Sequence, residues 1–219
     1  MSLFKNIFSK NNKDEIEEIK GLFEGKDFDS VILKGEKLLK RLKAEERKTI
    51  IKLLSLSHFN KGSNKIALTY FKEIASSSTN SDDWFNVTST AILAKEVDTG
   101  MNAFSKAIEF YQKNGTSENI PIGQMSYYVM QAFRDTEEYD LAFVQLMKLR
   151  DVYCELKITD PTFLHIRGLP FLSHVMEASK AILKNQKITE TQMWLKEFAS
   201  QLDEEGKSLI EKLANELKK

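Results

Sequence analysis

The sequence predicts an all-α protein built from antiparallel helix pairs that stack in a row. Three observations predict this fold class. From about Asp14 onward, apolar residues recur at three- and four-residue spacing, which is typical of amphipathic helices. The polar breaks between these stretches are short, which favours antiparallel neighbours. Several positions also recur 33 residues apart, which indicates that successive pairs are copies of one unit.

The first part of the chain predicts two helix pairs. Helices are expected over 13–24, 29–43, 45–60 and 63–76. The members of each pair are separated by a break that contains glycine and polar residues, Gly25-Lys26-Asp27 in one pair and Lys61-Gly62-Ser63 in the other. A first copy of the recurring unit is discernible at Ile19, Phe28, Val31 and Leu38.

The middle of the chain predicts four more helices, over 82–95, 99–113, 122–135 and 137–157. Ser81 precedes an acidic first turn, which is typical of a helix start. The loop 112–121 is the longest polar stretch in this series. It is an insertion between repeats, and both partner contacts and mere tolerance to sequence change are open interpretations.

The last part predicts helices over 162–184, 189–200 and 203–218. Asp160-Pro161 and Thr189 mark two of the starts. Gly168 and Pro170 interrupt the first of these helices, so a kink or break is expected there. His165 and His174 flank this break, which either helps to build a site or leaves them as boundary histidines.

The recurrence is clearest between two successive units. Leu54, Gly62, Ala67, Phe71 and Ile74 correspond to Val87, Lys95, Gly100, Phe104 and Ala107, and a third copy follows at Val129, Glu137, Tyr139, Ala142, Leu146 and Leu149. In each copy, a small residue near the start of the second helix allows close approach to the first. The large apolar residue four positions later then fills the space between pairs.

This pattern resembles the tetratricopeptide repeat (TPR). Trp84-Phe-Asn-Val87 through Ala91, followed by Gly100, Phe104 and Ala107, is the nearest match, although Ser55 and Thr88 stand where that family prefers glycine. The resemblance implies a right-handed superhelical array of antiparallel helix pairs, a TPR-like α-solenoid with C-terminal capping helices. It divides the chain into an N-terminal stub at 1–12, repeats over 13–157 and capping helices over 158–219 that are continuous with the array.

The same resemblance implies a function. In TPR-like arrays the first helices of successive pairs line a concave groove that receives a peptide or protein partner, as in an adaptor or scaffold. The groove positions carried over to this sequence are Lys52, Leu56, Phe85, Asn86, Ser89, Tyr127, Tyr128, Gln131 and Arg134. The competing interpretation is that Phe85 and one of the two tyrosines belong to the core.

Patterns that carry catalysis are not found in the sequence. There is no glycine-rich phosphate loop, no Gly-x-Ser-x-Gly and no His-Glu-x-x-His. His58, His165 and His174 have no accompanying ligand pattern, and Cys154 lies on an apolar helical run as a buried thiol would. We therefore expect no enzyme activity, no metal and no cofactor.

The charges give little attraction to nucleic acid, because 32 basic and 32 acidic side chains cancel. Residues 34–48 are dense in lysine and arginine, and a phosphate-contacting stripe there is the competing interpretation. The single cysteine indicates a reducing, cytoplasmic location. No transmembrane segment is expected, and the apolar residues Leu3, Phe4, Ile7 and Phe8 leave a weak membrane contact of the stub as an alternative.

Three other hypotheses stay open from the sequence. The protein could be an immunity or antagonist type that binds and blocks a single toxin or enzyme. It could also be a ligand-binding or enzymatic helical domain. The last two helices, which carry Met193, Trp194 and Phe198 and then Leu209 and Leu213, could form a dimerising hairpin instead of a cap and so make a homo-oligomer.

Overall fold

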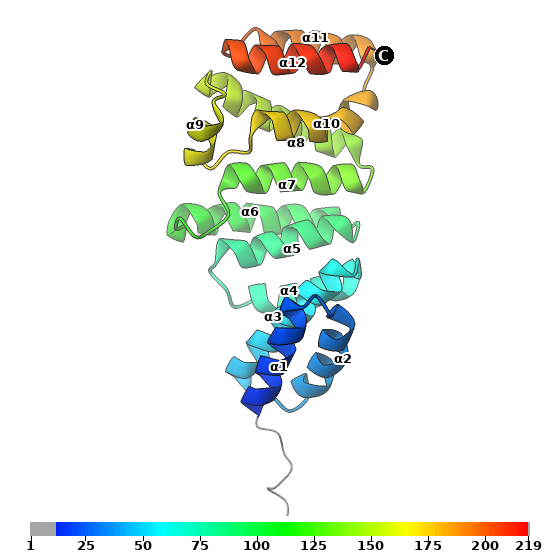
Figure 1. Cartoon of the computed structure of the whole chain (residues 1–219), viewed down its shortest axis with the longest axis vertical. Helices are drawn as coiled ribbons and strands as arrows, with labels where there is room; N and C mark the ends of the chain where they lie inside the picture. Colours follow the sequence, from blue (N-terminus) through cyan, green and yellow to red (C-terminus); the bar gives the residue numbers. More distant parts are fainter. Residues whose placement is uncertain (1–11, 219) are drawn as a thin grey trace, which may run out of the picture. The chain divides into compact units, whose positions relative to one another are not determined.

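The computed structural model describes residues 12–218 and contains twelve helices and no strand in that range (Figure 1). This confirms the all-α class. The helices form two compact units that divide between Thr79 and Asn80. The stub expected at 1–12 lies outside the described residues except for Asn12, which begins the first helix. No helix within residues 12–218 is long and apolar enough to cross a bilayer.

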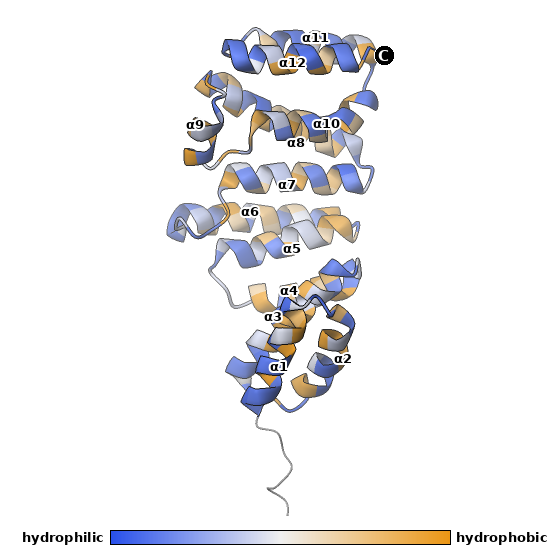
Figure 2. Cartoon of the chain, in the orientation of Figure 1, coloured by the Kyte–Doolittle hydropathy of each residue, from blue (hydrophilic) through white to orange (hydrophobic). Residues whose placement is uncertain are grey.

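The first unit contains α1 (Asn12–Glu24), α2 (Phe28–Leu39), α3 (Ala44–Asn60) and α4 (Asn64–Ala75). Each helix carries apolar and polar residues along its length, as amphipathic packing requires (Figure 2). Helices α1, α2 and α3 contact one another, and α4 packs on α3. The core between α1, α2 and α3 is formed by Ile16, Ile19, Val31, Leu38, Ile50 and Leu54, and Tyr70 of α4 packs against it.

The second unit begins with two helix pairs, α5 (Ser81–Leu93) with α6 (Val97–Asn114) and α7 (Ile122–Asp135) with α8 (Tyr139–Leu156). The short α9 (Pro161–Ile166) leads to α10 (Leu172–Lys184), and α11 (Ile188–Ala199) with α12 (Glu204–Glu216) completes the unit. Helix α5 packs on α7, and α10 packs on α7, α8, α11 and α12. The helices of this unit therefore lie in successive layers over one continuous core (Figure 1).

The turns inside the helix pairs share one backbone conformation. Lys26, Gly62, Lys95 and Glu137 all have φ between 59° and 70°. In each turn, two successive N–H groups donate to carbonyls of the preceding helix, as Lys95 does to Ile92 and Glu96 does to Ala91. Such a left-handed residue closes the helix end and reverses the chain. The correspondence of Gly62, Lys95 and Glu137 expected from the sequence is thus confirmed at the level of the turns.

The small residues expected at the start of the second helices are buried. Ala67, Gly100 and Ala142 are all in the interior of their units. A Cβ atom on Gly100 would lie 2.8 Å from the Ile92 Cγ1 atom and 3.2 Å from the Thr88 carbonyl oxygen. The close approach of α6 to α5 therefore depends on the missing side chain.

The expected break at Gly168 and Pro170 is also confirmed. Helix α9 ends at Ile166 and α10 begins at Leu172, so the single helix expected over 162–184 is two. Other bounds shift by a few residues; the largest shift is at 29–43, where the helix ends at Leu39. Asn80 rather than Ser81 caps α5, since the Asn80 side chain accepts from the Asp82 N–H. Asp160 caps α9 as expected.

Candidate partner-binding site

Two tyrosines on α7 form the centre of the candidate site. The Tyr128 side chain is 44% exposed, which is high for an aromatic ring in the middle of a packed helix. Its ring lies 6.1 Å from the Phe85 ring of α5 and 5.8 Å from the Tyr127 ring, measured between centroids. Aromatic pairs at this separation stabilise one another. Tyr128 is therefore exposed on one side and held in place on the other.

Phe85 does not line the surface as the sequence suggested. It is only 5% exposed and belongs to the core of the second unit. The competing interpretation, in which Phe85 is a core residue, is the correct one. Helix α5 turns this ring inward because its neighbours α6 and α7 both pack on α5. The Phe85 ring packs against the Tyr128 ring from the core side.

The segment between α9 and α10 forms the other wall of the site. Gly168 has a φ of 67°, and a Cβ atom there would lie 2.6 Å from the Pro121 Cβ atom. A Cβ atom on Gly123 would lie 2.5 Å from the Leu169 Cδ2 atom. These two glycines allow the break to lie directly against the start of α7.

A hollow of about 220 Å³ opens between these two walls. Residues of α7 and of the 165–174 segment line it: Gln124, Tyr127, Tyr128, His165, Leu169, Pro170, Phe171 and His174. The Tyr127 hydroxyl donates to the His174 carbonyl oxygen at 3.3 Å and joins the two walls. The Phe171 and His174 rings lie 5.3 Å apart. The site thus combines aromatic, imidazole and amide groups.

The protonation state of the tyrosine that joins the walls follows from its surroundings. Burial raises the pKa of Tyr127, and the nearby Arg134 only partly opposes this effect. The hydroxyl is therefore neutral near pH 7 and can donate its proton in a hydrogen bond. The Arg134 guanidinium is paired with the Asp135 carboxylate at 2.6 Å, so its charge is partly compensated.

The remaining residues of the predicted groove are distributed as follows. Gln131 and Arg134 are half-buried on α7 beyond the tyrosines, and Asn86 is half-buried on α5. The Ser89 hydroxyl donates to the Phe85 carbonyl oxygen at 3.2 Å, so it is used by its own helix. Lys52 is exposed and Leu56 is half-buried on α3 of the first unit.

Sequence reasoning missed part of the lining. It noted His165 and His174 beside the break but did not connect them with Tyr127 and Tyr128. Gln124 and Phe171 were not identified at all. Part of the signal was present, because the break at Gly168 and Pro170 was predicted and binding residues often lie on loops that a rigid scaffold positions. Its position against α7 required the fold.

The basic stretch at 34–48 lies on α2 and α3 and is partly neutralised. Lys34 pairs with Glu18, Arg41 with Glu15, and Arg47 with Glu73 at 3.1 Å. Because these three cations already face carboxylates, the stripe offers less charge to phosphate than its composition suggested. This observation counts against the nucleic-acid interpretation.

The chemistry of the other candidate groups is modest. Burial raises the pKa of the Cys154 thiol, with Arg150 opposing, so the reactive thiolate is scarce. Within residues 12–218, no group of three or more histidine, cysteine, aspartate and glutamate side chains could hold a metal ion.

No protein-family model matches the chain, and no curated protein matches it. The function must therefore be inferred from the fold and the site.

Proposed function

We propose that the protein is a non-catalytic interaction module that binds a peptide or a segment of another protein at the Tyr127–Tyr128 site. The observation that carries this proposal is the exposed Tyr128 ring, held by Phe85 and Tyr127 beside a hollow. Exposed aromatic rings that are already held in position lose little conformational freedom on binding, and tyrosine is enriched where interfaces gain most of their affinity.

The size of the hollow favours one anchoring side chain over a whole ligand. Its volume of about 220 Å³ is below the range of about 300–1,000 Å³ that is typical of small-molecule sites. A partner would insert one apolar or aromatic side chain between Tyr128 and Phe171. Its backbone would meet polar groups such as Gln124 at the rim.

The repeated hairpin turn supports a TPR-like architecture for the proposed interaction module. Four helix pairs closed by the same left-handed turn are the units from which a TPR-like α-solenoid is built, with α11 and α12 as its capping pair. In that arrangement Asn86 and Gln131 would extend the site along the groove. The single cysteine, Cys154, fits a cytoplasmic protein of this kind.

A site-specific crosslinking experiment tests the proposal. A photoreactive phenylalanine analogue would replace Tyr128 in the full-length chain, which is then illuminated in the native cell. We expect one or a few defined crosslinked proteins that mass spectrometry can identify. The matched control carries the same analogue at Val144, which is 46% exposed on α8 and outside the hollow. Crosslinks of equal yield at both positions would contradict the proposal.

Binding of the identified partner then provides the quantitative test. Tyr128→Ala should raise the dissociation constant about thirtyfold, since removal of a central aromatic anchor costs about 2 kcal/mol. Val144→Ala should change it by less than about twofold. Circular dichroism and thermal unfolding of both variants would show that the fold is retained.

A further inference from the structure

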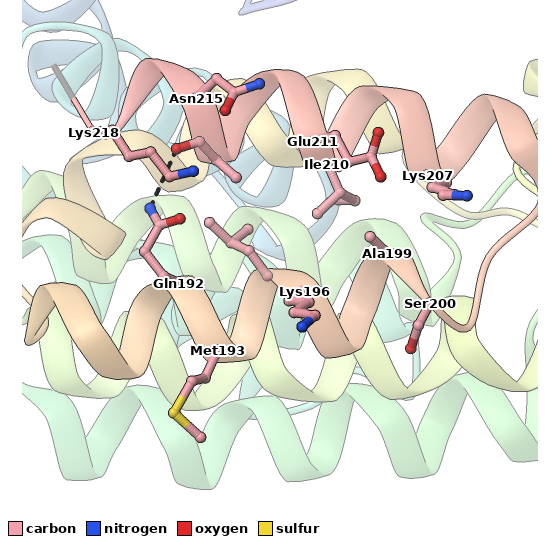
Figure 3. A pocket seen from close by; sticks show the side chains of 12 residues that line it. Gln192, Met193, Lys196, Ala199, Ser200, Lys207, Ile210, Glu211, Asn215 and Lys218 are labelled. Atoms are coloured by element: carbon pink, nitrogen blue, oxygen red, sulfur yellow. Dashed lines mark hydrogen bonds between the residues drawn. The ribbon is translucent and has the colours of Figure 1, made fainter.

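A second surface lies on the last helix pair, away from the tyrosine site. Residues of α11 and α12 line an open groove between the two helices (Figure 3). Its volume is about 710 Å³. Its base is formed by the buried Leu195, Ala199 and Ile210, and its more exposed apolar residues are Met193 and Ala214. The Gln192 side chain donates to the Ala214 carbonyl oxygen at 3.2 Å and joins the two helices at one end.

This groove is unusual for the outer face of a terminal helix pair. A capping pair normally presents a polar outer face, because nothing in the array covers it. Here Met193 lines the groove and is 66% exposed. Helix α10 packs on α11 and α12, so the pair is already covered on one side. No helix within residues 12–218 covers the groove.

The shape of the groove fits a helix. Successive layers of the second unit pack on one another: α7 packs on α5, and α10 packs on α7 and α8. Ala199 and Ala214 keep the space between α11 and α12 open, so one more helix could lie along it as the next layer. Amphipathic helices bind apolar grooves through residues spaced three and four apart.

The charge of the groove identifies the kind of helix. Lys196, Lys207 and Lys218 line it, against the single carboxylate of Glu211. The Lys207 ammonium lies 3.9 Å from the Glu204 carboxylate. The Glu204 side chain is 93% exposed, so this carboxylate compensates the charge of Lys207 only weakly. Lys196 and Lys218 form no ion pair with the described part of the chain. An apolar helix with acidic flanks is complementary to this arrangement.

We propose that the α11–α12 groove is a second docking surface, which binds an amphipathic helix of a partner protein with acidic residues flanking its apolar face. Two other occupants match the charge less well. A second copy of the chain, related by a twofold axis, would bring the lysines of one groove toward those of the other. The N-terminal stub carries Lys5 and Lys10 and no acidic residue before Asp14.

A displayed peptide library tests this proposal without a known partner. The probe is a set of helical peptides with leucines along one face and either glutamate or lysine at the flanking positions. We expect the full-length chain to enrich glutamate-flanked peptides about tenfold or more over lysine-flanked ones. This preference should weaken as salt increases, because the attraction is between partly exposed charges.

Charge reversal of the groove provides the matched comparison. Lys196→Glu with Lys218→Glu should abolish or invert the preference for acidic peptides. The control variant is Lys148→Glu with Lys157→Glu, which changes the net charge by the same amount. Both positions are exposed, on α8 and at its end, and lie outside the groove, so the preference should stay intact. Met193→Glu should weaken binding of acidic peptides about tenfold as well.

Several outcomes would overturn the proposal. Equal enrichment of acidic and basic peptides would do so, as would an equal effect of the two double variants. A wild-type dimer in analytical ultracentrifugation that Met193→Glu converts to a monomer would assign the groove to a second copy. Stronger peptide binding after deletion of residues 1–11 would assign it to the stub. Tyr128→Ala should not affect this assay, so the two proposals can fail independently.

Discussion

The buried hydroxyl of Tyr153 on α8 donates a hydrogen bond of 2.6 Å to the carbonyl oxygen of Pro170. Tyr153 is fully buried, and Pro170 lies in the break between α9 and α10. Burial strongly raises the pKa of this phenol, so it stays a neutral donor. A single side chain in the core thus holds the segment that forms one wall of the tyrosine site.

Tyr153→Phe should therefore destabilise the second unit by about 1–2 kcal/mol, because the Pro170 carbonyl loses its donor while the packing is almost unchanged. Urea unfolding would measure this difference. Tyr139→Phe, a change of the same kind at a half-buried position of α8, should cost less than about 0.5 kcal/mol. Equal effects of the two substitutions would show that the hydrogen bond does not secure the break.

A second tie joins the chain after α8 to the start of α12. The Thr159 N–H donates to the Asp203 carboxylate at 2.8 Å, the Thr159 hydroxyl donates to it as well, and the Gly206 N–H does so at 2.9 Å. Burial by itself raises the pKa of Asp203, but these three hydrogen bonds outweigh it and leave the pKa below its usual value.

A lowered pKa in the folded state means that the carboxylate contributes stability above the unfolded pKa of about 3.9 and loses it as the pH falls further. Asp203→Asn should lower the free energy of unfolding by about 1–3 kcal/mol at pH 7. The amide NH₂ group, which cannot accept a hydrogen bond, would replace one of the carboxylate oxygens that accept the three hydrogen bonds. Urea unfolding at pH 7 and pH 3 should show that the difference in unfolding free energy between Asp203→Asn and wild type is smaller at pH 3. Glu155→Gln, at an exposed position on α8, is the control; a gap that stays constant with pH would contradict the assignment.

The left-handed turn residues predict a stabilising substitution. Lys95 has a φ of 63°, a conformation that costs an L-residue about 1 kcal/mol but costs glycine little. Lys95→Gly should therefore raise the free energy of unfolding by about 0.5–1 kcal/mol. Lys148→Gly, in the interior of α8, should lower it by about 1 kcal/mol. Thermal and urea unfolding of the pair would check the opposite signs.

His58 predicts a pH dependence in the first unit. His58 is 5% exposed, and its ring stacks on the Tyr70 ring with centroids 5.9 Å apart. Burial lowers the pKa of His58, and Glu36 opposes this only in part. The unfolded chain therefore takes up a proton more readily than the folded one. Stability should be constant above a pH of about 6.5 and should fall below it.

Unfolding of the intact protein at pH 7.5 and pH 5 would reveal this loss in the transition of the first unit. His58→Gln should reduce the difference between the two pH values, since the titrating group is removed. His165→Gln changes an exposed histidine of the second unit and should leave the pH difference in the stability of the first unit as in wild type. An undiminished pH difference in His58→Gln would assign the effect to other groups.

The part of the fold that depends on local chemistry was predictable. Spacing of apolar residues predicted the all-α class, the 33-residue recurrence predicted the equivalent turns at Gly62 and Lys95, and the Gly168–Pro170 pair predicted the break. Each of these follows from backbone preferences or from which side of a helix is apolar. Such information is contained in a short stretch of sequence.

The candidate site was predictable only in outline. Tyr127 and Tyr128 lie together on one helix beside the hollow, but the predicted groove also included Phe85, which is buried. Periodicity shows which face of a helix is apolar, but it does not show how many neighbours cover that face. Helix α5 is covered by both α6 and α7, and this decides the position of the Phe85 ring.

The sequence by itself thus determined the helices, their pairing and the places where the chain turns, because these depend on residues close together in the chain. Only the tertiary structure brought the 165–174 segment against Tyr127 and left the groove between α11 and α12 uncovered. Both results depend on which helix surfaces meet over a long separation. That choice is made by the packing of the whole unit and not by any one segment.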